Sequence, residues 1–142
     1  MNCLIALLDV DHVHHLAIER WFLTYSSEGW ATSPITENGL VRVMSQPRYP
    51  SGRRSPHQIV ERLRTLKKNH GAAHQFWPDE ISLTDESVFR SEYITGSLYV
   101  TDIYLLGLAA KRGARLVSFD RSLPWQAIRN GTGRLIETPL LQ

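Results

Sequence analysis

Residues 101–119 join a helix pattern to a strand pattern through one glycine, and this unit limits the folds open to the chain. The segment TDIYLLGLAAKRG (101–113) is apolar along most of its length, with Lys111 and Arg112 just ahead of Gly113. Basic residues in a last turn and a glycine directly beyond it favour a helix that ends there. ARLVSF (114–119) then predicts a buried strand.

The same alternation of strand and helix recurs along the chain. WATSPI (30–35) predicts a short strand that leads into a helix over residues 36–45, although Gly39 weakens that helix. HQFWPDEISLT (74–84) predicts a strand followed by a turn, and GRLIET (133–138) a short final strand. Alternating strands and helices predict an α/β domain with a mainly parallel sheet. We expect residues 1–142 to form a single domain of this class.

Two further helices are expected. SPHQIVERLRTLKK (55–68) carries the clearest signal, because Ser55 can cap it, Pro56 suits its first position and Gln58 completes a capping box. Residues 13–23 have apolar side chains at mostly helical spacing, and SSEG ends that segment. The apolar positions there are Val13, Leu16, Ala17, Trp21 and Leu23.

Composition narrows the class of protein. No apolar run approaches the roughly 20 residues that span a bilayer, and the first residues lack the features of a signal peptide. The single cysteine, Cys3, cannot form an intramolecular disulfide and fits a reducing compartment, so we expect a cytoplasmic protein. The net charge of +2 does not by itself indicate nucleic-acid binding. Basic runs at 47–56 and 61–70 fit either a solvated surface or an edge that contacts phosphates.

Three acidic residues follow expected strands or open expected helices. Glu37 comes just after the strand at 30–35, Asp102 opens the helix at 101–113, and Asp120 follows the strand at 114–119. Ligands of parallel α/β sheets bind at the carboxyl ends of the strands. Carboxylates gathered there would repel one another, and a divalent cation such as Mg²⁺ relieves that repulsion. The alternative is that each acid only stabilises a helix N-terminus.

The stretch DVDHV (9–13) allows another interpretation. It fits the DxDx[TV] pattern of haloacid-dehalogenase phosphatases, in which the first aspartate is a nucleophile and the second a general acid. The later motifs of that family do not follow in the right order, and Asp9 and Asp11 fit better as the end of a first helix and the loop beyond it. Zinc binding by this histidine-rich stretch lacks a second pair of ligands.

Several segments together resemble the PIN-domain ribonucleases, above all the VapC-like toxins of type II toxin–antitoxin systems. They are SPITENGLVRV (33–43), VTDIYLLGLA (100–109), RLVSFDRSL (115–123) and the opening helix NCLIALLDVDHVHHLAIERWF (2–22). The resemblance implies a three-layer α/β/α fold, a Mg²⁺- or Mn²⁺-dependent endoribonuclease, a homodimer, and an antitoxin partner that restrains it.

Carried over to this sequence, the resemblance implies that Glu37, Asp102 and Asp120 hold the metal ion or its waters. Ser118 stands at the hydroxyl position of the family's TxD motif, and Asn2 at the asparagine of its opening DxN motif. Arg42 and Arg121 are candidate contacts for the RNA substrate, and salt bridges to neighbouring acids are the alternative.

One family feature has no counterpart in this sequence. The aspartate of the DxN motif would stand two positions ahead of Asn2, directly before Met1, together with the first strand. We therefore expect the first, central strand of the sheet to be truncated. A start codon assigned too far downstream would explain this. The alternative is a catalytically silent PIN-like protein that still binds RNA or antitoxin.

Overall fold

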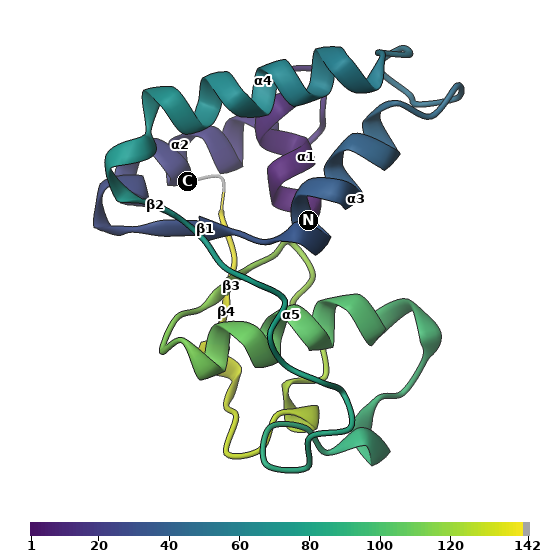
Figure 1. Cartoon of the computed structure of the whole chain (residues 1–142), viewed down its shortest axis with the longest axis vertical. Helices are drawn as coiled ribbons and strands as arrows, with labels where there is room; N and C mark the ends of the chain where they lie inside the picture. Colours follow the sequence, from purple (N-terminus) through teal and green to yellow (C-terminus); the bar gives the residue numbers. More distant parts are fainter. Residues whose placement is uncertain (141–142) are drawn as a thin grey trace. The chain divides into compact units, whose positions relative to one another are not determined.

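The computed structural model describes residues 1–140, which divide into two compact units (Figure 1). The first unit comprises residues 1–79 with 139–140, and the second comprises residues 80–138. Each unit contains helices and a pair of parallel strands, so the prediction of an α/β protein with parallel strands is confirmed. No helix within residues 1–140 is long and apolar enough to cross a membrane.

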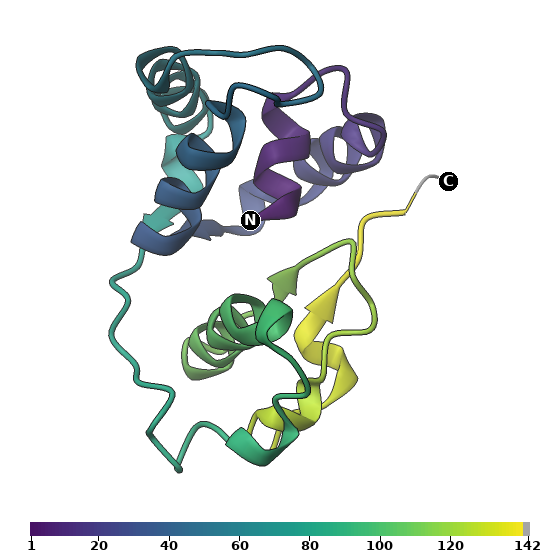
Figure 2. The same ribbon diagram turned by 90° about the vertical axis from the view of Figure 1, so that its right-hand side faces the viewer.

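The first unit packs its helices side by side next to a short parallel sheet. In chain order its elements are α1 (Asn2–Leu8), α2 (His15–Tyr25), β1 (Trp30–Thr32), α3 (Pro34–Met44), α4 (Pro56–Asn69) and β2 (His74–Phe76). Short 3-10 turns lie at Ser26–Glu28 and Gly71–Ala73. In the sheet, Trp30 lies opposite His74 and Thr32 opposite Phe76. Figure 2 shows α1 between α2 and α3, with α4 packed against α3.

The core of the first unit joins α1, α3 and α4. Its buried side chains are Ile5, Leu40, Met44, Ile59 and Leu63. Each such side chain stabilises the fold by about 1.5–3 kcal/mol relative to an exposed position. Gly39 lies where α3 approaches the start of the chain, and a Cβ there would collide with the sulfur of Met1. Close packing therefore accounts for a glycine that lowers the intrinsic stability of α3.

Capping boxes set where α3 and α4 begin. In α4, Gln58 N–H donates to Ser55 Oγ (3.2 Å) and Ser55 N–H donates to Gln58 Oε1 (2.8 Å), which confirms the predicted cap. A second capping box, at the start of α3, pairs Ser33 with Thr36 and was not predicted. Because of it, α3 starts at Pro34, two residues ahead of the expected start.

The helix predicted at residues 13–23 forms, but the buried face is not the one that the apolar spacing suggests. α2 buries Ala17, Ile18 and Phe22. Val13, Leu16 and Leu23 are 81%, 59% and 64% exposed. Apolar residues occupy more than one side of this helix, so spacing alone did not select the buried side. The packing of Phe22 selects the buried side. The centroid of its ring lies 5.1 Å from that of Trp30 and 4.8 Å from that of His70.

The second unit is organised around one apolar helix. Its elements are α5 (Val100–Lys111), β3 (Leu116–Val117) and β4 (Ile136–Glu137), with 3-10 turns at Ser91–Tyr93, Ser97–Tyr99, Trp125–Ala127 and Gly133–Leu135. Gly113, at φ 66°, follows the end of α5 as predicted. The strands predicted over 114–119 and 133–138 are shorter, because only Leu116–Val117 and Ile136–Glu137 pair. The Thr132 side chain caps a 3-10 turn that occupies the start of the second segment.

Candidate active site

Asp102 and Asp120 are electrostatic neighbours in the second unit. Asp102 lies in the first turn of α5, whose Ncap residue, Tyr99, makes no side-chain capping hydrogen bond. Burial raises the pKa of Asp102 above its usual value, and the negative charge of Asp120 acts in the same direction. A buried carboxylate beside a second negative charge is an acidic position that a cation would stabilise. Asp102 and Asp120 thus belong to the same unit, and their role as metal ligands stays a prediction.

Ser118 and Ser122 hold the backbone and side chain of Asp120. Ser118 is buried, with 2% of its surface exposed, and its N–H donates to Glu137 O (2.9 Å) in the continuation of the β3–β4 pairing. The backbone N–H of Asp120 donates to Ser118 Oγ (3.1 Å). Asp120 Oδ1 accepts hydrogen bonds from the backbone N–H and the hydroxyl of Ser122 (2.8 and 2.6 Å). The hydroxyl at position 118 therefore holds the backbone of Asp120.

Glu37 lies in the first unit, in the first turn of α3, just beyond the end of β1. Its Oε1 accepts a hydrogen bond from Thr32 Oγ1 (2.6 Å) and forms an ion pair with Lys67 Nζ from α4. The Glu37 and Lys67 side chains are 19% and 28% exposed. Glu37 is thus held by a hydroxyl and by a partly buried cation.

His74 extends this network from β2. Its Nε2 lies 2.8 Å from Thr32 Oγ1, and its ring stacks at a tilt against Trp30, with centroids 4.3 Å apart. The Thr32 hydroxyl has one proton, which it donates to Glu37, so His74 Nε2 carries the proton of the second hydrogen bond. Burial lowers the pKa of His74 and the Lys67 charge lowers it further, while the Glu37 charge opposes them. His74 is therefore a neutral donor near pH 7.

Thr32, Lys67 and His74 were not identified from the sequence. His74 joins the Glu37 network only through strand pairing, and Lys67 only through helix packing. The parallel register of β1 and β2 places His74 opposite Trp30, and packing of α4 on α3 brings Lys67 to Glu37. One signal was available, since Lys67 belongs to the basic run of residues 61–70.

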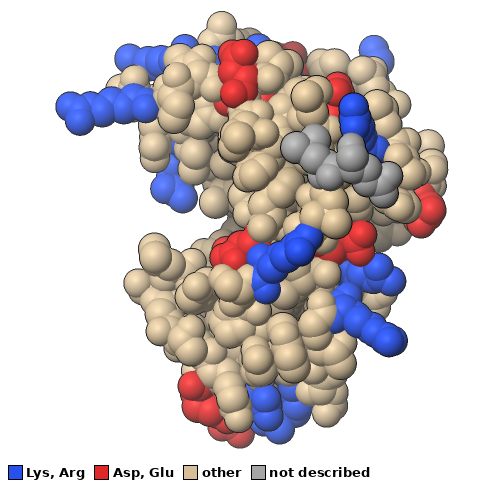
Figure 3. All heavy atoms as spheres, turned by 180° about the vertical axis from the view of Figure 1, so that it is seen from behind, with Lys and Arg blue, Asp and Glu red and all other residues tan. Residues whose placement is uncertain are grey.

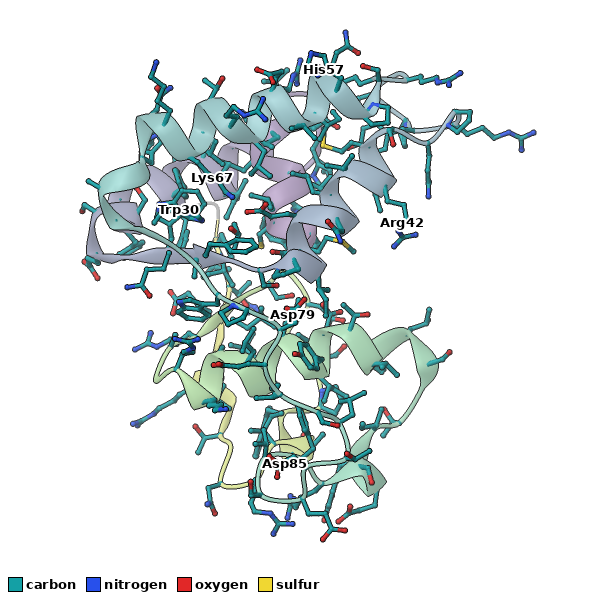
Figure 4. All side chains as sticks on the ribbon, in the orientation of Figure 1. Trp30, Arg42, His57, Lys67, Asp79 and Asp85 are labelled. Atoms are coloured by element: carbon teal, nitrogen blue, oxygen red, sulfur yellow. The ribbon has the colours of Figure 1, made fainter. Side chains whose placement is uncertain are left out.

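The remaining predicted residues have separate positions. Asn2 is the half-buried first residue of α1. Arg42 is exposed in the last turn of α3, and Figure 4 shows it well away from Lys67. Arg121 is exposed in the loop after β3. Within residues 1–140, no group of three or more histidine, cysteine, aspartate or glutamate side chains is gathered closely enough to hold a metal ion.

Asp9, the first acid of DVDHV, anchors a loop. It is 1% exposed, and its Oδ2 accepts hydrogen bonds from Tyr49 Oη (2.7 Å) and Ser51 Oγ (2.6 Å). Its Oδ1 accepts from the Asp11 N–H (3.2 Å). A carboxylate buried and bonded in this way has no access to a phosphate ester, so the phosphatase interpretation is wrong for this residue. Asp9 ends α1, as expected.

The loop that Asp9 anchors carries the first basic run. Arg48 and Arg53 are exposed, and Arg54 is half-buried, with its charge acting on Asp9. Figure 3 shows several lysine and arginine side chains projecting from the surface of the first unit. The Asp9 carboxylate therefore fixes the backbone from which these arginines extend.

Comparison with known proteins identifies the family. The model of the PIN domain matches residues 2–127, a range that contains every predicted catalytic residue, and the chain belongs to this family. It is similar to three ribonucleases of Mycobacterium tuberculosis. VapC44 is 39% identical over 139 residues, 97% of this chain and 95% of that protein. VapC39 is 42% identical over 123 residues, 87% of each chain, and VapC38 is 41% identical over 123 residues, 84% of this chain and 82% of that protein. Within the PIN domain family, the chain thus groups with the VapC ribonucleases.

Proposed function

We propose that this chain is a divalent-metal-dependent endoribonuclease and the toxin of a type II toxin–antitoxin system. The observation that carries the proposal is the similarity to VapC ribonucleases over 97% of the chain, together with the paired carboxylates Asp102 and Asp120. Glu37 would complete the acidic set, and Asn2, which stands at the asparagine of the family's opening motif, would also belong to the site. RNA is the proposed substrate, and an antitoxin and a second copy of the chain are the proposed partners, in the cytoplasm.

The chemistry of the acids fits Mg²⁺ or Mn²⁺. Both ions prefer oxygen ligands, and Asp102 is a carboxylate whose charged form is disfavoured by burial, which a bound cation would offset. Asp102, Asp120 and Glu37 would hold the ion. When bound, it would activate water for attack on a phosphodiester and stabilise the charge that develops.

The chain's own residues position these acids and the substrate. Ser118 and Ser122 fix the direction of the Asp120 carboxylate through the hydrogen bonds to its backbone and Oδ1. Thr32, backed by His74, does the same for Glu37. Arg42 and Arg121 are exposed cations that would contact RNA phosphates. The three-layer order of the sheet stays a prediction.

The activity is tested with a mixed RNA pool and a DNA pool of matched sequence. We expect cleavage of RNA in Mn²⁺ or Mg²⁺, no cleavage after chelation, recovery when the metal ion is restored, and no cleavage of DNA. Binding of RNA or antitoxin without cleavage would instead favour a silent PIN-like binding protein. Cleavage that continues in excess chelator would contradict the metal dependence.

A further inference from the structure

Lys67 occupies a more constrained position than a surface lysine. Its ammonium forms the ion pair with Glu37 of α3 and lies 5.1 Å from the centroid of the Phe76 ring of β2. Cations placed over an aromatic face are attracted to its electron density. Two elements, α3 and β2, therefore hold the Lys67 side chain in place, and only 28% of it is exposed.

The Glu37 carboxylate is also fixed from the other side. Thr32 donates to it at 2.6 Å, and His74 lies 2.8 Å behind the Thr32 hydroxyl. A carboxylate oriented by a hydrogen bond and paired with an ammonium is in a low-energy state without any further cation. A divalent ion that binds Glu37 must therefore displace Lys67 or share the carboxylate with it.

We infer that Lys67 is a positioning residue that acts as the resident counter-cation of Glu37 and competes with the divalent metal ion for this carboxylate. The inference rests on the proposed function, because it takes Glu37 as a metal ligand. When only a minor state of a protein can bind a ligand, the apparent dissociation constant is the intrinsic one divided by the fraction of molecules in that state. If Lys67 leaves Glu37 available for roughly a tenth to a third of the time, the dissociation constant for the metal ion rises about three- to tenfold.

The alternative is an ion pair that only joins α3 to α4. Partly exposed pairs of this kind contribute little to stability, typically up to about 1 kcal/mol. Removal of Lys67 would then change the melting temperature slightly and leave the affinity for a metal ion unchanged. Metal affinity is therefore the measurement that separates a competing cation from a purely structural one.

The test is calorimetric titration of the full chain with Mn²⁺, comparing Lys67→Met, Lys67→Arg and Lys68→Met. Lys68 is the next residue of α4 and is exposed, so Lys68→Met makes the same change in total charge away from Glu37. We expect Lys67→Met to bind Mn²⁺ about three- to tenfold more tightly than the unmodified chain. Lys67→Arg, which keeps the charge, and Lys68→Met should stay within about twofold, because screened surface charges act weakly at a distance.

Glu37→Gln separates failure of this inference from failure of the proposed site. If Glu37→Gln weakens Mn²⁺ binding and Lys67→Met matches Lys68→Met, the counter-cation inference is overturned and the metal site stands. If Glu37→Gln leaves Mn²⁺ binding unchanged, Glu37 is not a ligand and both fail. In the double variant Glu37→Gln/Lys67→Met, the tightening caused by Lys67→Met should disappear. Lys67→Gln replaces Lys67→Met if the latter does not fold.

Discussion

Asp102→Asn is expected to lower Mn²⁺-dependent RNA cleavage at least about 100-fold while the protein remains folded. Asparagine keeps the size of the side chain but removes the charge that would hold the metal ion. Burial raises the pKa of Asp102 and the Asp120 charge adds to this, so the folded chain disfavours the carboxylate near pH 7. Loss of that charge should raise the melting temperature rather than lower it.

Asp85→Asn is the matched control for this variant. Asp85 is an exposed aspartate of the same unit, and the substitution makes the same change in charge (Figure 4). Its cleavage rate should remain within about twofold of the unmodified chain, as expected for a surface substitution away from the site. Equal cleavage by Asp102→Asn and the unmodified chain would remove Asp102 from the catalytic set.

Asp9→Ala is expected to destabilise the protein by about 2–4 kcal/mol. The Asp9 carboxylate is 1% exposed and accepts hydrogen bonds from Tyr49 and Ser51, whose hydroxyls would lose their acceptor. The loop over residues 48–54 should then become sensitive to proteases, because its connection to the end of α1 is lost. Chemical denaturation and limited proteolysis measure the two effects.

Asp11→Ala and the pH dependence of stability complete this experiment. The Asp11 side chain is exposed, so its removal should cost less than about 0.5 kcal/mol. Burial acts to raise the pKa of Asp9, but hydrogen bonds from Ser51, Tyr49 and the Asp11 N–H outweigh this effect and lower the pKa below 3.8. A lowered folded-state pKa gives stability that is present above pH 3.8 and lost as the pH falls through the folded-state value. The Asp9→Ala variant should not show this loss of stability at low pH. Equal destabilisation by Asp9→Ala and Asp11→Ala would contradict the anchoring role of Asp9.

The sequence predicted the helices well where local signals and packing agree. The Ser55–Gln58 capping box and the stop at Gly113 depend on neighbouring residues, and both are present. Apolar spacing did not indicate the buried face of α2, because Leu16 and Leu23 satisfy helical spacing and yet are exposed. Strand lengths were overestimated at 114–119, since pairing partners and not β propensity decide where a strand ends.

The sequence supplies candidate acids for the site but not their arrangement. Motif order made Asp102 and Asp120 candidates, and in the structure the charge of Asp120 acts on Asp102. The pairing of Glu37 with Lys67 depends on the packing of α3 against α4, 30 residues further along the chain, and no local pattern encodes it. The anchoring role of Asp9 depends in the same way on Tyr49 and Ser51.

The measurement that tests the central claim most directly is calorimetric Mn²⁺ binding by the unmodified chain, Glu37→Gln, Asp102→Asn and Asp120→Ala. The claim is that these three carboxylates share one divalent ion that the chain uses to cleave RNA. We predict one Mn²⁺ per chain and an affinity that falls at least several-fold in each variant, because each loses one ligand of the same ion. An Mn²⁺ affinity that is unchanged in all three variants would contradict the account.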